Sequence, residues 1–244
     1  MKQIIAIFFL AAFSPLGNVN AQAADDGVLS LVVRVVKEQV AVQDLLKPDH
    51  PLWQDAGGNL IHLNRTPPLY SNEAQDDGQR PSASVRVLRM PDNTGIIFLQ
   101  WEDESENHFG TGKKYPDGGD EHIYKTQTVS TDRFGDAACV MVPRQRGEHK
   151  KYPLIMMGEK EAPVDLALWQ AERGFALLSA HGRETTENPQ WQQQGFSSYQ
   201  NGVWSVIQVV PDLQPKTPIC FAIWDGQKEH HGGIKYYSLW YEVN

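Results

Sequence analysis

The chain has 244 residues, with 22 Lys and Arg against 30 Asp and Glu, which gives a formal net charge of −8 at pH 7. This length suits one large all-β domain or two small ones, and 41% hydrophobic residues supply enough apolar surface for a core. The acidic balance argues against a nucleic-acid partner, because phosphate binding requires clustered Lys and Arg. The 2 cysteines are too few for a four-thiolate zinc or iron–sulfur site.

Residues 1–23 have the pattern of a secretory signal peptide. Lys2 precedes an apolar run from Gln3 to Phe13, and Ala21-Gln22-Ala23 follows as a small-x-small cleavage pattern. The apolar run is too short for a permanent membrane anchor. We therefore expect cleavage after Ala23, a periplasmic location and a mature chain of residues 24–244 without a membrane span. Because Lys2 is the only charged residue removed, the mature chain has a formal charge of −9.

Short apolar or alternating runs, separated by Gly, Pro, Asn and Asp, fill the mature sequence and predict β-strands. In chain order they cover Val28–Val40, Ser84–Arg89, Gly95–Trp101, Ala137–Val142, Tyr152–Met157, Val164–Gln170, Phe175–Ala180, Val203–Val210, Ile219–Trp224 and Ile234–Val243. Short helices are favoured only at Val42–Leu46 and Asn188–Gln194, and long loops at Gln54–Pro81 and Glu102–His122. The pattern predicts a single all-β domain, an antiparallel β-sandwich with a few short helices and long loops.

The sequence contains none of the common catalytic motifs. Gly-x-Ser-x-Gly, His-Glu-x-x-His and Gly-x-Gly-x-x-Gly are all missing. The adjacent pair His230-His231 would point to opposite faces of a strand, so an exposed turn is favoured over a metal site. The carboxylates of Asp117–Glu121 attract Ca²⁺ in principle, but they lack the spacing of a twelve-residue calcium loop and favour a solvated turn. We therefore expect a non-catalytic protein.

The two cysteines, Cys139 and Cys220, each lie inside a predicted strand. They form a disulfide if these strands are neighbours, or remain two small buried thiols, and the sequence leaves both possibilities open. Neither belongs to a Cys-x-x-Cys-His motif, so a covalently attached c-type haem is excluded.

Several segments carry a resemblance to a known family. They are Asp136–Pro143, Tyr152–Gly158, Pro163–Trp169, Phe221–Gly226 and Gly232–Trp240. Together they resemble the haem b-binding γ subunit of periplasmic molybdenum enzymes of the dimethyl sulfoxide reductase type. That group includes ethylbenzene dehydrogenase, selenate reductase, chlorate reductase and dimethylsulfide dehydrogenase. The resemblance is clear from about residue 130 to the C-terminus and loose before it. Its most specific part is the order of the motifs: an aspartate-led strand ending in Pro, a Met-Gly turn, a Pro-Val-x-x-x-x-Trp strand, a Trp-Asp-Gly turn and a last strand with Lys.

The resemblance implies one non-covalent haem b with Met and Lys as axial ligands. Lys235 matches the family's lysine, and Met157, directly before Gly158, matches its methionine best, with Met141 and Met156 as alternatives. With two protein ligands the iron is six-coordinate, which indicates electron transfer rather than catalysis. A lysine amine ligates iron only when deprotonated, and apolar surroundings favour that form.

The resemblance also implies the partners. We expect a heterotrimer with a molybdopterin catalytic subunit and an iron–sulfur subunit, and a soluble c-type cytochrome as electron partner. The alternative hypothesis is a haem-free secreted carbohydrate-binding module. Trp53, Trp101 and Trp191 lie near expected loops, where exposed aromatic rings would stack on sugars.

Overall fold

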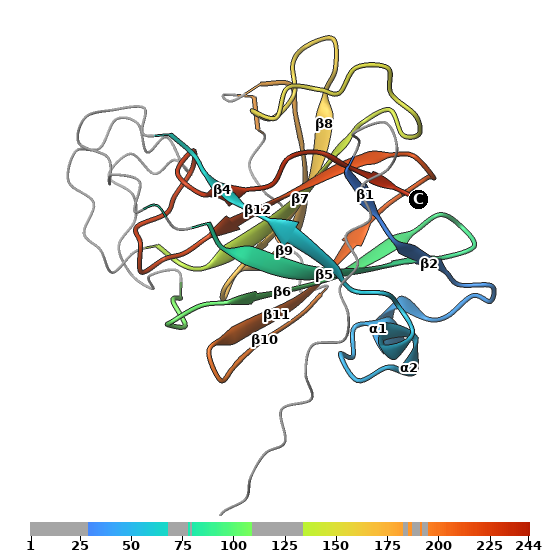
Figure 1. The fold of residues 1–244 in the computed structure, drawn as a ribbon, viewed down its shortest axis with the longest axis horizontal. Helices are drawn as coiled ribbons and strands as arrows, with labels where there is room; N and C mark the ends of the chain where they lie inside the picture. The colour runs from blue at the N-terminus through green and yellow to red at the C-terminus, as the bar shows by residue number, and fades with distance from the viewer. Residues whose placement is uncertain are drawn as a thin grey trace, which may run out of the picture.

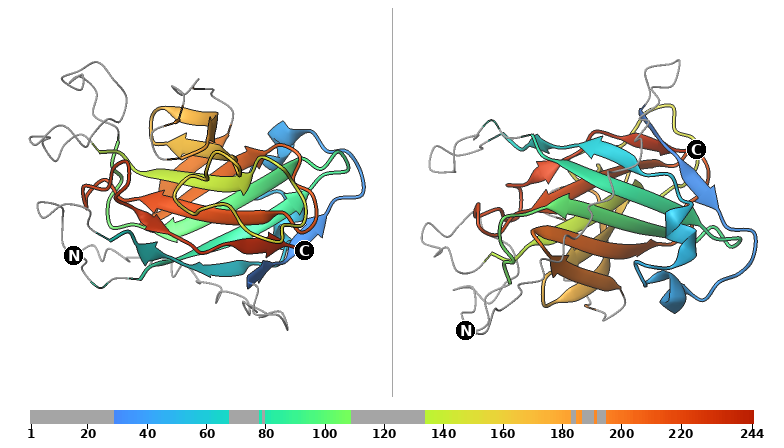
Figure 2. Two further views of the ribbon diagram at one scale, coloured as in Figure 1. Left: turned by 90° about the horizontal axis from the view of Figure 1, so that it is seen from above. Right: turned by 60° about the horizontal axis from the view of Figure 1, so that its bottom comes forward.

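A computed structural model describes residues 29–67, 78, 80–108, 134–182, 185–186, 191 and 195–244. Two largely antiparallel sheets pack face to face, with two short helices beside them (Figures 1 and 2). The all-β sandwich predicted from the sequence is therefore confirmed. Within these ranges, no helix combines the length and the apolar character needed to cross a bilayer.

The first sheet has eight strands in the order β1-β14-β12-β7-β8-β9, with β13 beside β12 and β4 beside β13. β1 runs parallel to β14, and the other pairs are antiparallel. The strands are β1 (Leu29–Leu31), β4 (Asn64–Arg65), β7 (Ala137–Pro143), β8 (Val164–Gln170), β9 (Gly174–Ala180), β12 (Pro218–Trp224), β13 (Tyr236–Tyr237) and β14 (Tyr241–Val243).

The second sheet has six strands in the order β10-β11-β6-β5-β2, with β3 also paired to β5. Here β2 runs parallel to β5 and the remaining pairs are antiparallel. The strands are β2 (Val33–Val35), β3 (Asn59–His62), β5 (Ser82–Arg89), β6 (Gly95–Glu102), β10 (Phe196–Gln200) and β11 (Val203–Val210).

Alternation along the strands divides the apolar side chains among three buried layers. The main core lies between the sheets, where Val140 and Phe221 of the first sheet meet Leu99 and Trp204 of the second. On the outer face of the second sheet, α1 (Val42–Leu45) and α2 (Pro51–Gln54) cover a smaller cluster (Figure 1). A third cluster lies on the outer face of the first sheet. The first sheet therefore has buried apolar side chains on both of its faces, unlike a sheet with one face in water.

One predicted strand is wrong because the chain changes sheets within it. Val28–Val40 was expected as one long strand, but β1 belongs to the first sheet and β2 to the second. The crossing occurs at Val32, whose N–H donates to Asn59 Oδ1 at 2.8 Å and whose carbonyl accepts from Asn59 Nδ2 at 3.1 Å. The amide of Asn59 thus replaces a neighbouring strand as hydrogen-bond partner.

Three further expectations need correction. Tyr152–Met157 is irregular and ends in a turn rather than forming a strand, and Ile234–Val243 contains only the short strands β13 and β14. The expected loop Gln54–Pro81 contains β3 and β4. The helix predicted at Val42–Leu46 is confirmed by α1. The helix predicted at Asn188–Gln194 and the greater part of the loop Glu102–His122 lie outside the described residues.

Candidate functional site

The outer face of the first sheet is an apolar surface, hereafter the outer apolar face. Its floor consists of buried side chains from β7, β8, β9 and β12 that point away from the main core: Cys139, Met141, Val164, Leu166, Leu168, Ala180 and Cys220. Partly buried side chains pack around this floor: Ile155, Met157, Leu178, Trp191, Ala222, Trp224 and Trp240. The predicted methionine ligand and a set of aromatic side chains therefore meet on one surface.

Lys235 lies at the rim of the outer apolar face. It directly precedes β13 and, in the register that places Tyr236 opposite Ile223, it falls beside Trp224. Its Nζ lies 5.1 Å from the centroid of the Trp224 ring and donates to the Gly232 carbonyl at 3.2 Å. The side chain of Lys235 thus extends along the face to which Met141 and Met157 contribute.

The backbone of Lys235 is held by a residue distant in the sequence. Lys235 N donates to Thr66 Oγ1 at 2.9 Å, and Thr66 N donates to the Lys235 carbonyl at 2.9 Å. Thr66 Oγ1 also donates to this carbonyl at 3.2 Å. Thr66 therefore fixes the position from which the lysine side chain starts.

The three methionines differ in how the fold presents them. Met141, on β7, is 6% exposed and stands opposite Cys220 in the floor. Met157 is half-buried in a turn with a positive φ of 73°. Gly158 closes this turn by donating its N–H to the Leu154 carbonyl at 2.8 Å. The position favours glycine, because an added Cβ would lie 2.7 Å from the Ala162 carbonyl oxygen. Met156 is 40% exposed. Met141 and Met157 thus both belong to the outer apolar face, one in its floor and one at its edge.

The two cysteines lie on neighbouring strands in the floor of this face. Cys220 stands opposite Met141, and Cys139 opposite Ala222, so the two thiols are diagonal neighbours. The structure holds both as reduced, buried thiols. A disulfide between diagonal positions would need the strands to shift, because directly opposite residues lie closer together. The disulfide thus stays one of the two alternatives that the sequence leaves open.

The charge of Lys235 acts on this floor. Burial raises the pKa of the Cys220 thiol well above its usual value, the neighbouring Cys139 raises it further, and Lys235 opposes both effects. The lysine is therefore electrostatically coupled to the outer apolar face, as a residue with its side chain along that face must be.

The aspartate-led strand and the Trp-Asp-Gly turn of the sequence meet at one end of the sandwich. Asp136 precedes β7, and its Oδ1 accepts from Gly226 N at 2.9 Å. Its Oδ2 accepts from Asn107 N at 2.7 Å and from Trp204 Nε1 at 2.9 Å. These residues join the two sheets away from the outer apolar face. The aspartate before β7 and the Trp-Asp-Gly turn after β12 thus have a structural role, because Asp136 binds both the turn and the second sheet.

The histidine pair departs from expectation. His230 is 1% exposed rather than part of an exposed turn, and its Nδ1 accepts from Asp225 N at 3.3 Å. Burial, together with the positive charges of Arg65 and Lys228, lowers the pKa of His230 to about 3. The ring of His231 instead stacks on Phe134. The imidazole of His230 therefore accepts a backbone hydrogen bond, whereas that of His231 packs against an aromatic ring.

The three tryptophans named for a carbohydrate-binding platform do not lie together. Trp53 is 1% exposed under the helices, and Trp101 is 4% exposed in the main core. Trp191 packs at the outer apolar face. These three rings lie in three separate clusters and share no surface. The acidic stretch Asp117–Glu121 lies outside the described residues.

Neither the family models nor the curated proteins that were compared with the chain give a match.

Proposed function

We propose that this chain is the electron-transfer subunit of a periplasmic molybdenum oxidoreductase and binds one non-covalent haem b on the outer apolar face. Lys235 and Met157 are the proposed axial ligands, with Met141 and Met156 as the alternative sulfur ligands. The observation that carries the proposal is that the Lys235 amine and the Met157 thioether, distant in the sequence, border the same apolar surface. The resemblance of residues 130–244 to the γ subunits of such enzymes supports the same assignment.

The donor atoms on this face fit the proposed group. A thioether is a soft ligand that favours ferrous iron, and a neutral amine completes six-coordination without leaving a site for substrate. When bound, the haem supplies a reversible one-electron change. The chain's own contribution is positional: Thr66 holds the Lys235 backbone, and Trp224 and Trp240 supply apolar surface that keeps water away. A drier environment favours the uncharged amine that a ligand must be.

The partners follow from the resemblance. Electrons would pass between the iron–sulfur subunit, which stands beside a molybdopterin catalytic subunit, and a soluble c-type cytochrome. The formal charge of −9 on the expected mature chain favours a basic partner cytochrome, because opposite charges steer encounter. Such steering weakens as ionic strength rises, so an electron-transfer rate that does not depend on salt would reject it.

The direct test is the visible spectrum of the purified protein after expression with sufficient haem. We expect a low-spin b-type spectrum, and a colourless protein would overturn the proposal. Lys235→Ala should change both spectrum and reduction potential, whereas Lys216→Ala, which removes an exposed lysine at 54% side-chain exposure, should change neither.

The sulfur ligand is identified by three volume-conserving variants, Met157→Leu, Met141→Leu and Met156→Leu. Only the variant that removes the ligand should lose the six-coordinate spectrum while unfolding at the same urea concentration as the wild type. Loss with Met157→Leu alone supports the assignment made here. Loss with Met141→Leu alone transfers the ligand role to the strand residue, and three unchanged spectra would reject methionine ligation.

A further inference from the structure

A second group of side chains gathers at the end of the sandwich, away from the outer apolar face. Asp103 follows β6, Asp136 precedes β7 and Asp225 follows β12. One carboxylate oxygen of each lies within 4.8 Å of those of the other two. Asp136 is fully buried, Asp103 is 7% exposed and Asp225 is partly buried. Three carboxylates from three chain segments thus converge between the sheets.

Three carboxylates this close together repel one another when they are charged. Lys228 places one ammonium 3.5 Å from Asp225 Oδ2. Burial, then the charges of Asp136 and Asp225, raise the pKa of Asp103 to about 7. Burial likewise raises the pKa of Asp136, although hydrogen bonds from Gly226, Asn107 and Trp204 oppose the shift. A divalent cation would neutralise the excess charge that makes this arrangement costly.

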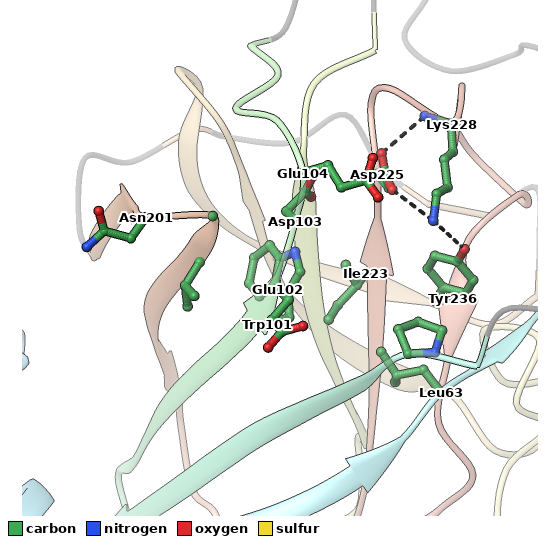
Figure 3. A pocket seen from close by; sticks show the side chains of 13 residues that line it. Leu63, Trp101, Glu102, Asp103, Glu104, Asn201, Ile223, Asp225, Lys228 and Tyr236 are labelled. Atoms are coloured by element: carbon green, nitrogen blue, oxygen red, sulfur yellow. Dashed lines mark hydrogen bonds and ion pairs between the residues drawn. The ribbon is translucent and has the colours of Figure 1, made fainter. Parts of the chain in front are cut away.

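Trp101 supplies an independent indication of a ligand. Its side chain is 4% exposed, and its indole nitrogen has no hydrogen-bond partner within the described part of the chain. Figure 3 shows this nitrogen on the side of the ring that faces Asp103 and Asp225. The Trp101 indole N–H lies near enough to the Asp103 carboxyl to lower its pKa, but it is not positioned to form a well-aligned hydrogen bond with that carboxyl. A buried N–H needs an acceptor, and an oxygen bound to a cation would provide one.

A cavity of about 520 Å³ adjoins the cluster. Trp101, Asp103 and Asp225 line it together with Asn201, Lys228 and Tyr236 (Figure 3). The cavity leaves room for the water or ligand oxygens that a cation requires beyond the carboxylates.

The cluster is also preorganised. Asp136 is fixed by its hydrogen bonds from Asn107, Trp204 and Gly226. Asp103 Oδ1 accepts from Ser105 N at 3.2 Å, and its backbone carbonyl accepts from Tyr199 Oη at 2.9 Å. Asp225 Oδ1 accepts from Lys228 N at 3.1 Å. The oxygen atoms are therefore held in place before an ion arrives.

We propose that Asp103, Asp136 and Asp225 bind one calcium ion, whose open side faces the cavity and whose bound water or ligand oxygen accepts the Trp101 N–H. All three side chains offer oxygen, which selects a hard cation over zinc or copper. Three carboxylates on separate segments form an irregular site, which calcium tolerates and magnesium does not. The site is independent of the proposed haem face, since no residue is shared between them.

The test titrates the purified full chain, freed of metal by a chelator, with CaCl₂ and follows heat and tryptophan fluorescence. We expect saturable binding of one ion with a dissociation constant of about 0.1–1 mM, the range of extracellular calcium modules. Trp204 bonds directly to Asp136, so the fluorescence should change together with the heat. No saturable signal up to about 10 mM would overturn the proposal, and so would equal affinity for MgCl₂.

Variants locate the site. Asp103→Asn and Asp225→Asn should each weaken calcium binding at least tenfold, whereas Asp212→Asn should leave it unchanged. Asp212 is an exposed residue at a positive φ of 52°, a conformation that asparagine adopts readily. Without calcium, Asp103→Asn should melt at or above the wild-type temperature, because it removes a repelling buried charge. Wild-type affinity in both cluster variants would overturn the assignment.

Discussion

A single added methyl group at Gly226 tests the packing at the end of the sandwich, where Gly226 follows β12 and Asp136 precedes the neighbouring strand β7. Gly226 donates its N–H to Asp136 Oδ1 at 2.9 Å. A Cβ built at Gly226 would lie well inside van der Waals contact of the Phe134 carbonyl oxygen, and 2.7 Å from Asn107 Cβ. The Phe134 obstacle is backbone, which cannot rotate away as a side chain would. Gly226→Ala must therefore displace the Trp-Asp-Gly turn from the start of β7.

The cost has two parts. Overpacking a tightly packed position costs about 1–3 kcal/mol. Losing a hydrogen bond to a buried carboxylate costs roughly 1.5–3 kcal/mol. We therefore expect Gly226→Ala to lower the free energy of unfolding by about 3–5 kcal/mol, which is a large part of the stability of an ordinary domain.

Urea unfolding followed by tryptophan fluorescence measures this loss. With a slope of about 2 kcal/mol/M, the midpoint should fall by roughly 2 M. Gly58→Ala is the matched control, because the nearest atom to its added Cβ is Ser84 Oγ at 3.9 Å, and it should cost no more than about 0.5 kcal/mol. A Gly226→Ala protein within about 1 kcal/mol of Gly58→Ala would refute the steric argument.

Three further predictions concern a buried amide, a buried imidazole and the residue that holds Lys235. Gln208 Nε2 donates to the Ala138 and Ala167 carbonyls across the core, while its Oε1 has no partner among the described residues. Gln208→Leu loses the two hydrogen bonds but also removes the buried oxygen without a partner, so it should change the free energy of unfolding by less than about 1 kcal/mol. A loss above about 3 kcal/mol in urea unfolding would show that the two effects do not offset each other. Because the pKa of His230 is about 3 in the fold against a usual 6.5, its stabilising effect is complete above pH 6.5 and is lost as the pH falls towards 3. The difference in unfolding free energy between wild type and His230→Asn should therefore change by about 3 kcal/mol from pH 7 to pH 4, and a constant difference would contradict the burial argument. If Lys235 ligates haem, Thr66→Val should shift the reduction potential without unfolding the protein and Thr66→Ser should restore it; an unshifted potential would show that Thr66 does not position the ligand.

The sequence predicts the strands whose alternation matches their burial. Val164–Gln170 and Val203–Val210 agree with β8 and β11 to the residue, because apolar side chains alternate along each strand. The alternating side of β8 lies on the outer apolar face, and that of β11 lies in the main core. It misses β10, Phe196–Gln200, a polar strand at the sheet edge that no apolar period marks. It also cannot show where Val28–Val40 leaves one sheet for the other, because that crossing depends on Asn59, which is distant in the sequence.

The same limit applies to the candidate sites: the sequence shows local alternation along a strand, but not which distant segments meet. Alternation on β7 predicts that Cys139 and Met141 share a face, but the meeting of that face with Lys235 depends on β13 pairing with β12. The role of Thr66 has no local signal, since a threonine after a short strand is common. The acidic cluster is equally hidden, because Asp103 and Asp225 approach one another only when the two sheets close.

The parallel pairing of β1 with β14 bears on how the molecule acquires its fold. Leu29 stands opposite Tyr241, a contact that closes a chain of roughly 210 residues. Contacts so remote along the chain slow the folding of β proteins, because loop-closure entropy is lost before pairing compensates for it. This edge of the first sheet can assemble only after β14 has been synthesised, so β1 has no partner strand there until then. A version truncated before β14 should remain an incompletely folded intermediate.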